Sequence, residues 1–307
     1  ARQTWAAVAR AVAHFEPVTM VVAPSDIHRC REHLRNDTAH PIDIVIADLD
    51  DAWMRDIGPT FVVADDRLGG VDWVFNGWGA QPWASWDDDA QVAELVSDVA
   101  GAAHLPSTLV NEGGGIHVDG QGTVLLTETV QLDPGRNPGL TRDDVEAEMA
   151  RAIGATHAIW LPRGLTRDYD EFGTRGHIDI VACFSEPGVV LLHWQDDPEH
   201  PDHEVSREAE AVLLAATDAK GGPLRVVRVP APRTLRDDEG WVDWSYINHL
   251  VCNGGVIACT FDDARDDEAL TVLREAYPGR EVVGVDARPL YDRGGGIHCI
   301  TQQQPAI

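Results

Sequence analysis

Cysteine and positive charge are both scarce in this chain. Five of its 307 residues are cysteines, and none lies in a Cys-x-x-Cys pair, which argues against a disulfide scaffold and for free thiols in the cytoplasm. Lys and Arg together number 24 against 51 Asp and Glu, so the formal net charge is −27. A nucleic acid partner is not expected, because a phosphate backbone binds to a basic face. The acidity favours a small cationic ligand, unless it serves only solubility.

Long apolar runs are missing as well. No run approaches the roughly 18 to 20 residues of a membrane-spanning helix, so no membrane partner is expected. The chain starts at Ala1 with no signal-peptide pattern and no initiator methionine, which leaves room for residues before it. A length of 307 residues suits one large domain or two smaller ones. Because no linker or low-complexity tract divides the chain, we expect a single domain over residues 1–307.

Segments with helical periodicity alternate with short apolar segments along the chain. The sequence Thr-Arg-Asp-Asp from Thr141 is typical of a helix start. Alternation of this kind predicts an α/β or α+β fold. We expect helices over residues 5–15, 27–35, 88–100, 141–153, 203–219 and 265–277, and strands over 18–22, 42–46, 58–63 and 71–75.

A glycine-rich pentapeptide occurs twice. Gly-Gly-Gly-Ile-His begins at Gly113 and again at Gly294. Looser copies, in which glycine precedes a strand-like segment, begin near residues 58, 176 and 254. Glycine often precedes a strand in proteins without repeats, but self-similarity of this kind is typical of repeat architectures. The pattern therefore predicts five copies of one supersecondary element around a centre.

Reactive side chains stand beside glycines or turns at the ends of expected strands, where rigid scaffolds present functional groups. A thiol together with an imidazole suggests covalent catalysis. Three carboxylates near the thiol would raise its pKa and oppose the thiolate, unless the substrate brings positive charge. A guanidinium does so, and carboxylates match its donors in pairs. The set therefore indicates a cysteine that attacks a guanidinium held by two acids. The side chains concerned are Asp56, Glu112, His177, Asp179, His298 and Cys299.

Two imidazoles compete for the role of partner to the thiol. His298 and Cys299 are adjacent, and neighbours on an extended segment face opposite sides, so both should not enter one site. His177 is therefore the better acid or base. Asp179 follows two positions after His177, and on a strand it would face the same side.

Seven stretches carry a recognisable pattern: residues 50–61 (DDAWMRDIGPTF), 72–79 (DWVFNGWG), 112–120 (EGGGIHVDG), 159–164 (IWLPRG), 176–179 (GHID), 253–255 (NGG) and 296–305 (GIHCITQQQP). With them the chain resembles the agmatine deiminase family from about residue 5 to its end. This family is part of the guanidine-modifying deiminases and amidinotransferases, beside the bacterial peptidylarginine deiminases. The resemblance implies a five-bladed α/β propeller, the pentein fold, with pseudo-fivefold symmetry. It implies no metal and no organic cofactor.

The resemblance also assigns roles to single residues. Cys299 matches the family nucleophile and His177 the general acid and base. Asp56 and Asp179 match the carboxylates that hold the guanidinium, and Glu112 matches the acid that supports His177. The implied reaction has two steps: the thiol attacks the guanidinium carbon and ammonia leaves, and water then releases a ureido product from an S-alkylthiouronium. For agmatine that product is N-carbamoylputrescine.

Three positions differ from the usual pattern of the family. Arg175 stands before the Gly-His pair, Arg293 stands before the last glycine triplet, and Ile180 replaces a usual Asn. The two arginines would repel the ammonium of agmatine and suit a carboxylate, unless both are solvated or paired with nearby acids. Arg175 is therefore a candidate for binding the substrate. Trp53 is either a core aromatic or a cation–π partner of the substrate.

Three classes of function stay open at this point. The first is hydrolysis of an N-alkylguanidine, with agmatine before others. The second is deimination of a carboxylated guanidine (guanidinobutyrate, arginine or peptidylarginine) or transfer of the amidino group to an amine. The third is a guanidine-binding propeller without catalysis, against which the complete residue set counts. A homo-oligomer is left open too.

Overall fold

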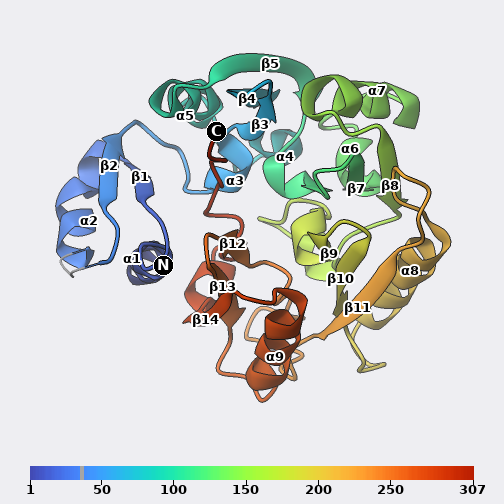
Figure 1. The fold of residues 1–307 in the computed structure, drawn as a ribbon. Helices are drawn as coiled ribbons and strands as arrows, with labels where there is room; N and C mark the ends of the chain where they lie inside the picture. The colour runs from blue at the N-terminus through green and yellow to red at the C-terminus, as the bar shows by residue number, and fades with distance from the viewer. Residues whose placement is uncertain (35–37) are drawn as a thin grey trace.

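The computed structural model describes residues 1–34 and 38–307, and their strands form five sheets. In Figure 1 the sheets follow one another in chain order around the middle of the molecule, with helices on their outer sides. The strands are β1 (Val18–Val22), β2 (Ile42–Ile46), β3 (Thr60–Ala64), β4 (Arg67–Val74), β5 (Ala103–Val110), β6 (Ile116–Val118), β7 (Thr123–Thr127), β8 (His157–Leu161), β9 (Ala182–Glu186), β10 (Val189–Trp194), β11 (Arg225–Pro230), β12 (Leu250–Cys252), β13 (Gly255–Thr260) and β14 (Glu281–Asp286).

The helices fall into two groups by length. The longer ones are α1 (Arg2–Val12), α2 (Ile27–His33), α5 (Val92–Ala100), α7 (Arg142–Ile153), α8 (Asp202–Ala215) and α9 (Asp266–Ala276). The four-residue helices are α3 (Met54–Ile57), α4 (Gly77–Ala80), α6 (Glu128–Gln131) and α10 (Arg288–Tyr291).

One supersecondary unit recurs in four of the sheets. Its first strand pairs antiparallel with the second strand. A helix then connects the second strand to the third, which pairs parallel with the second. Parallel strands are usually joined by a right-handed βαβ connection of this kind. The units are β3–β4–α5–β5, β6–β7–α7–β8, β9–β10–α8–β11 and β12–β13–α9–β14. The fifth sheet is the parallel pair β1–α2–β2. The predicted α/β class is thus confirmed, with a repeated element.

The glycine copies do not all occupy the same place in this unit. The segments at residues 58, 113 and 176 precede the first strands β3, β6 and β9. Gly254 instead lies in the two-residue turn between β12 and β13, where its φ of +74° suits an Asn-Gly hairpin. Gly294 leads into a turn rather than a strand. The prediction of glycine followed by a strand is therefore confirmed at Gly254, which leads into β13 rather than into the first strand of its unit, and it is wrong for Gly294. The segment before β12 is residues 245–249.

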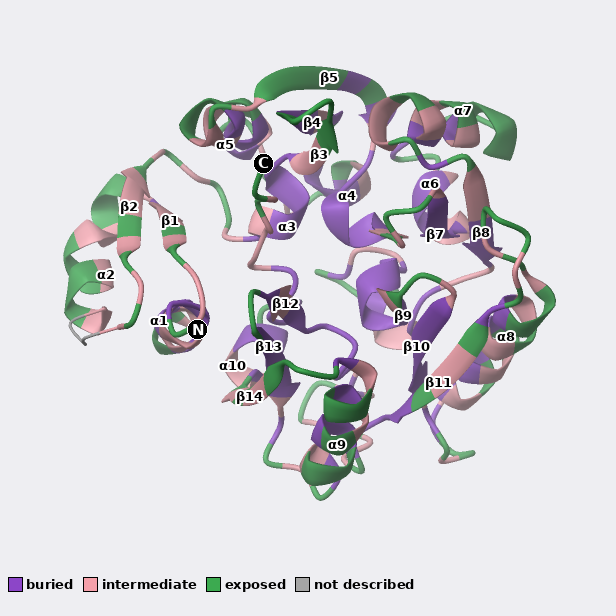
Figure 2. Ribbon diagram, viewed as in Figure 1, coloured by how far each residue is buried: buried purple, intermediate pink, exposed green. Residues whose placement is uncertain are grey.

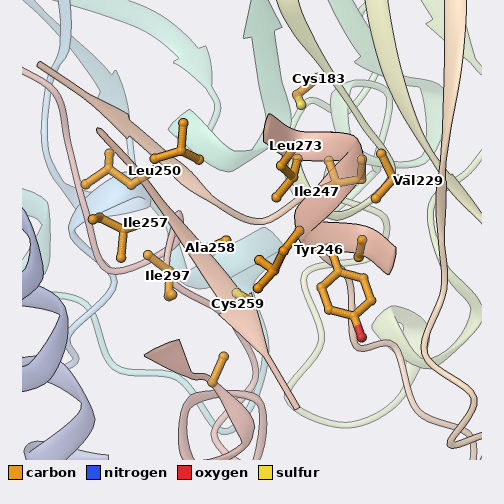
Figure 3. Close-up of a cluster of buried hydrophobic side chains, with 14 of the residues drawn as sticks. Cys183, Val229, Tyr246, Ile247, Leu250, Ile257, Ala258, Cys259, Leu273 and Ile297 are labelled. Carbon is orange, nitrogen blue, oxygen red and sulfur yellow. The ribbon is translucent and has the colours of Figure 1, made fainter. Parts of the chain in front are cut away.

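The middle strands of the units form the most buried part of the sheets. Strands β7, β10 and β13 are buried along nearly their whole length, because each has a partner on both edges and a helix over one face. Figure 2 shows this burial near the middle and exposure on the outer helices. A cluster around β13 also takes in Cys183 and Val229 of the neighbouring sheet (Figure 3). Shared packing of this kind fixes neighbouring sheets against each other.

Most of the expected elements are confirmed, with shifts at their ends. Strands β1 and β2 have the predicted bounds. Helix α7 starts as expected, because the side chains of Thr141 and Asp144 form a reciprocal capping box. The helix expected over 203–219 ends at Ala215, where the backbone becomes extended at the next residue. The helix expected over 27–35 ends at His33, and residue 35 lies outside the described residues. None of the helices in the described part is long and apolar enough to cross a membrane.

Candidate active site

Cys299 lies on a turn over residues 297–300 that follows α10. The backbone N–H of Arg55 donates to the carbonyl of Cys299 at 2.9 Å, and the Arg55 Nε donates to the carbonyl of His298 at 3.3 Å. Helix α3 therefore holds the turn that carries the thiol. Burial raises the pKa of the Cys299 thiol well above its usual value, and the charges of Asp179 and Asp56 raise it further. A thiol in these surroundings keeps its proton until a positive charge arrives.

Asp56 is presented at the end of helix α3. It accepts hydrogen bonds from Trp78 Nε1 at 2.9 Å and from the backbone N–H of Gly114 at 3.0 Å. Burial raises the pKa of Asp56 to about 6, against the opposing charge of His177. A carboxylate of this kind is ionised at neutral pH but gains from a cationic partner.

The segment before β6 approaches Asp56 closely, and this explains why residue 114 is a glycine. A Cβ on Gly114 would lie 2.5 Å from Nδ1 of His177 and 2.8 Å from Oδ1 of Asp56. No side chain fits there, so a glycine at this position lets the backbone N–H of Gly114 donate directly to the carboxylate.

Asp179 is held on the opposite side of the thiol. Its Oδ2 accepts from His298 Nδ1 at 2.7 Å and from Asn248 Nδ2 at 3.1 Å, and it lies 3.6 Å from Sγ of Cys299. The other carboxylate oxygen, Oδ1, is buried and has no hydrogen-bond partner in the protein. Although burial raises the pKa of Asp179, the bond and charge of His298 more than offset it, so the pKa lies below its usual value. Asp179 is thus an ionised carboxylate with one free oxygen.

His177 and Glu112 form a buried pair. His177 Nε2 is 3.2 Å from Glu112 Oε2, and His177 Nδ1 is 3.9 Å from Asp56 Oδ1. Burial alone would lower the pKa of His177, but Asp56 and Glu112 raise it to about 9. Arg136 Nε lies 3.0 Å from both oxygens of Glu112. Burial opposes ionisation of Glu112, yet Arg136 brings its pKa down to about 2. At neutral pH the imidazole is therefore protonated and the glutamate ionised.

A cavity of about 230 Å³ opens onto the thiol. Trp78 and Trp83 stack with ring centroids 5.4 Å apart, and Phe172 meets Trp83 edge-on at 5.3 Å. These rings form an aromatic wall beside the charged groups. The residues that line the cavity are Asp51, Trp53, Asp56, Trp78, Trp83, Phe172, Thr174, Arg293, Gly294 and Cys299. Trp53, which was expected to be either a core residue or a wall of the site, is both buried and part of the lining.

A second cavity of about 190 Å³ lies on the other side of Asp179. Its polar lining includes His117, His249, His298 and Tyr277. His298 and Cys299 thus line different cavities, although Asp179 contacts both side chains. Within residues 1–34 and 38–307, no group of three or more His, Cys, Asp or Glu side chains is arranged to hold a metal ion.

The strand expected to carry His177 and Asp179 is not present. Residues 178–180 form a 3₁₀ helix, with His177 at its N-terminal flank. Both side chains still reach the site: His177 approaches Asp56, and Asp179 approaches Cys299. The predicted grouping stands, but strand alternation is the wrong reason for it, because a tight helical turn directs these side chains.

Several residues that build the site were not singled out in the sequence. Asn248 donates to Asp179 and, at 3.2 Å, to the sulfur of Cys299. It lies just before β12, the first strand of its unit. In the other units the glycine motifs occupy this position, so comparing the units strand by strand would have drawn attention to Asn248. Asp168 accepts from the backbone N–H groups of Gly176 and His177. Arg136 lies in a turn, and no motif in the sequence indicated that it binds Glu112.

The two arginines flagged in the sequence lie in different surroundings. Arg175 is not among the residues that line the cavity. Its guanidinium lies 3.7 Å from Asp133 and donates to Gln81 at 3.4 Å. Arg293 does line the cavity. The suggestion that Arg175 binds the substrate therefore has no support from the geometry, and Arg293 is the better candidate. Ile180 packs in a hydrophobic cluster.

Known proteins resemble this chain over nearly its whole length. The sequence model of the Porphyromonas-type peptidyl-arginine deiminase family matches residues 1–305. A Streptomyces coelicolor protein with a provisional agmatine deiminase name is 59% identical, over 99% of this chain and 89% of its own. The agmatine deiminase of Stutzerimonas stutzeri is 41% identical, over 100% of this chain and 88% of its own.

Solved structures agree with the sequence matches. The agmatine deiminase of Enterococcus faecalis superposes with a TM-score of 0.92 at 34% identity, covering 99% of this chain and 87% of that one. The fold of the chain described here is thus shared with that protein over nearly its whole length. Together with the family match and the sequence relatives, this shows that the chain belongs to the agmatine deiminase family.

Proposed function

We propose that the protein hydrolyses agmatine to N-carbamoylputrescine and ammonia, with Cys299 as the nucleophile. It is a hydrolase of C–N bonds in linear amidines, as its agmatine deiminase relatives are. The observation that carries the proposal is the meeting of a thiol, a protonated imidazole and three carboxylates in one buried region. Sγ of Cys299 is 3.6 Å from Asp179, and His177 lies between Asp56 and Glu112.

A guanidinium supplies the charge that this site lacks. Two ionised carboxylates, Asp56 and Asp179, flank the thiol, and planar carboxylates match the donors of a guanidinium. The bound cation offsets the charges of Asp56 and Asp179, so it removes the part of the rise in the pKa of Cys299 that these charges add to the effect of burial. The thiol then releases its proton to solvent as the substrate binds. The substrate itself therefore activates the nucleophile.

His177 serves first as acid and then as base. The thiolate sulfur of Cys299 forms a bond to the guanidinium carbon, the imidazolium of His177 gives its proton to one nitrogen, and the C–N bond breaks to release ammonia. The S-alkylthiouronium stays on Cys299. Neutral His177 next takes a proton from water, the resulting hydroxide adds to the same carbon, and the C–S bond breaks. The hydroxyl proton is lost to solvent as the C–O bond becomes a carbonyl, so the thiolate is restored and the product is a ureido compound. Glu112 supports both steps by holding the ring through Nε2.

The cavity also bears on the far end of the substrate. Apart from Asp56, which is assigned to the guanidinium, its charged lining residues are Asp51 and Arg293. Asp51 can accept from the ammonium of agmatine, and the wall of Trp78, Trp83 and Phe172 suits its methylene chain. Because the guanidinium of Arg293 would pair with a carboxylate, a guanidine with a carboxylate tail is a second candidate substrate.

A substrate panel tests the proposal. Agmatine, 4-guanidinobutyrate and arginine are compared by kcat/KM, with ammonia and ureido product both measured. We expect agmatine to be preferred, and Arg293→Gln to increase that preference. Arg175→Asn is the matched control, because Arg175 lies outside the cavity lining. A preference for guanidinobutyrate that is lost in Arg293→Gln would replace agmatine by the carboxylated substrate.

The covalent step has its own test. Cys299→Ala should abolish turnover with the fold retained, since the other cysteines lie outside the lining of this cavity. Cys30→Ala, on helix α2, is the control and should keep wild-type activity. Reactions of the wild type quenched during turnover and analysed by mass spectrometry should show the thiouronium adduct on the peptide with Cys299. Near wild-type turnover by Cys299→Ala would contradict the mechanism.

We also propose that the five sheets are the blades of a propeller with pseudo-fivefold symmetry, formed by a single domain over residues 1–307. Four units of identical topology and the parallel pair β1–β2 support this arrangement. Five free cysteines, three of them buried in sheets, support a reducing compartment such as the cytoplasm. Limited proteolysis that yields one resistant fragment would support the single domain.

A further inference from the structure

The two cavities meet at one carboxylate. Cys299 lines the cavity of about 230 Å³, and Asp179 lines the cavity of about 190 Å³ behind it. Their contact, 3.6 Å from Sγ to Oδ2, separates the two spaces. Residues of the second cavity that touch Asp179 can therefore influence the reacting site without reaching the substrate.

The hydrogen bonds to Asp179 are divided unevenly between its oxygens. Oδ2 is approached by three donors: His298 Nδ1 at 2.7 Å, Asn248 Nδ2 at 3.1 Å and the thiol of Cys299 at 3.6 Å. Oδ1 has none, although it is buried. An unpaired buried carboxylate oxygen is costly, so its presence needs an explanation such as a ligand that donates to it. One oxygen is thus anchored by the protein, and the other is free to accept from a ligand.

His298 is the anchor that lies nearest. Because an ionised carboxylate only accepts, the Nδ1 that faces Asp179 carries the proton. Burial lowers the pKa of His298, and the charge of Arg55 lowers it further, so the ring is neutral and has a single N–H. Its backbone is fixed as well: the N–H donates to Asn248 Oδ1 at 2.9 Å, and the carbonyl accepts from Arg55. The ring therefore has one orientation.

We propose that His298 is a positioning residue for guanidinium binding, acting through Asp179: its Nδ1–H holds Oδ2 so that Oδ1 is directed to the substrate. This inference rests on the proposed role of Asp179 as a guanidinium ligand. His298 is not among the residues that line the cavity around Cys299 and lines the second cavity instead. Its effect is to select which oxygen and which rotamer of Asp179 the substrate meets.

A pair of amide substitutions separates this role from simple packing. In His298→Asn, the side-chain N–H₂ can take the place of Nδ1, because it is the same number of bonds from Cβ. In His298→Gln, the amide lies one bond further out, so no donor stands at the Nδ1 position. Both variants keep a polar group toward the second cavity, so both are expected to fold. His117→Asn is the matched control, since His117 lines the same cavity and accepts from the backbone N–H of Phe184 at 3.1 Å rather than contacting Asp179.

The readouts are the KM for agmatine and the Kd for agmatine in a Cys299→Ala background, where no reaction follows binding. We expect His298→Gln to raise both by roughly tenfold to a hundredfold, the range for a lost charge-assisted hydrogen bond. His298→Asn should stay within a few-fold of the wild type, as should His117→Asn. In an Asp179→Asn, Cys299→Ala background, the difference between the two His298 variants should vanish.

Failure of the inference can be told from failure of the proposed function. If the wild type binds and hydrolyses agmatine but His298→Asn and His298→Gln have equal KM and Kd values, the positioning role is wrong while the proposed function stands. If the wild type and its Cys299→Ala variant bind no guanidine, the proposed function is wrong and the inference fails with it.

Discussion

At the scale of single residues, the protonation state of Cys299 decides when the site can react. Burial and the nearby carboxylates Asp179 and Asp56 keep the proton on its thiol. The same carboxylates raise the pKa of His177 to about 9, so one set of charges stabilises both the protonated thiol and the protonated imidazole. A positive substrate reverses the first effect while the imidazolium remains available as an acid. The residues thus act as one unit, and single substitutions should have large effects.

Asp56→Asn should lower kcat/KM for agmatine by roughly tenfold to a hundredfold or more. The substitution removes the charge from one side of the guanidinium in a buried site, where charge-assisted bonds contribute about 1.5–3 kcal/mol. Steady-state kinetics measures the loss, and Asp98→Asn on the exposed face of α5 is the control. An Asp56→Asn variant with wild-type efficiency would show that Asp56 is not a guanidinium ligand.

The affinity for agmatine should depend on pH through Asp56. The cation binds the ionised carboxylate, whose pKa is raised to about 6, so affinity is full above that pH and lost as the pH falls through it. Calorimetry in a Cys299→Ala background should show Kd rising about tenfold per pH unit below about 6. The added Asp56→Asn substitution should remove this step. A Kd that is constant from pH 7 to pH 5 would contradict the role of Asp56.

At the scale of elements, the site is built by short turns rather than by long strands. Helix α3 has four residues, the Asp179 segment is one turn of 3₁₀ helix, and Cys299 lies on a turn. Such pieces have little stability of their own and depend on contacts between them. Arg55 supplies several of these contacts, because it binds the carbonyls of His298 and Cys299 and the side chain of Gln303 at 2.6 Å.

Arg55→Lys should lower kcat by about tenfold or more while a folded protein remains. Lysine keeps the positive charge but loses the planar fork that reaches both the His298 carbonyl and Gln303, so the turn with the thiol is less firmly placed. Arg151→Lys on α7, where the exposed Arg151 pairs with Glu148 of the same helix, is the control. Kinetics and melting temperature are measured together, and unchanged kcat in Arg55→Lys would contradict the role of Arg55.

At the scale of the whole molecule, a formal net charge of −27 surrounds a buried, negatively charged cavity. A field of one sign raises the concentration of opposite charges near the surface and speeds their encounter. Trp53, Trp78 and Cys299 of that cavity belong to one hydrophobic cluster.

Salt should therefore weaken the use of a dicationic substrate. Between roughly 10 and 200 mM NaCl we expect kcat/KM for agmatine to fall several-fold, because the Debye length shortens from about 30 to below 10 Å. The value of kcat should change little, since the chemistry proceeds in a buried site. A kcat/KM that does not respond to salt would show that the overall acidity serves only solubility.

The sequence predicted many parts of the structure because their causes are local. The strands at residues 18–22 and 42–46 follow from short apolar runs, and the start of α7 follows from the Thr141 capping box. The grouping of Asp56, Glu112, His177, Asp179 and Cys299 was inferred from residue type beside glycine, helped by the family resemblance. The 3₁₀ turn at residues 178–180 was missed, because the periodicity of three residues cannot separate a turn from a strand.

What the sequence determined by itself is the chemistry: a thiol, an imidazole and an excess of carboxylates, all fixed by residue type, and a repeated α/β element. What only the tertiary structure decided is which partners each group has. Asn248, Arg55 and Arg136 are ordinary polar residues until folding brings them beside Asp179, the Cys299 turn and Glu112. Arg175 and Arg293 are equally close to motifs in the sequence, but only Arg293 lines the cavity. The reason is physical: burial and charge proximity act across space, over separations of 24 to 248 residues here, and no local pattern records them.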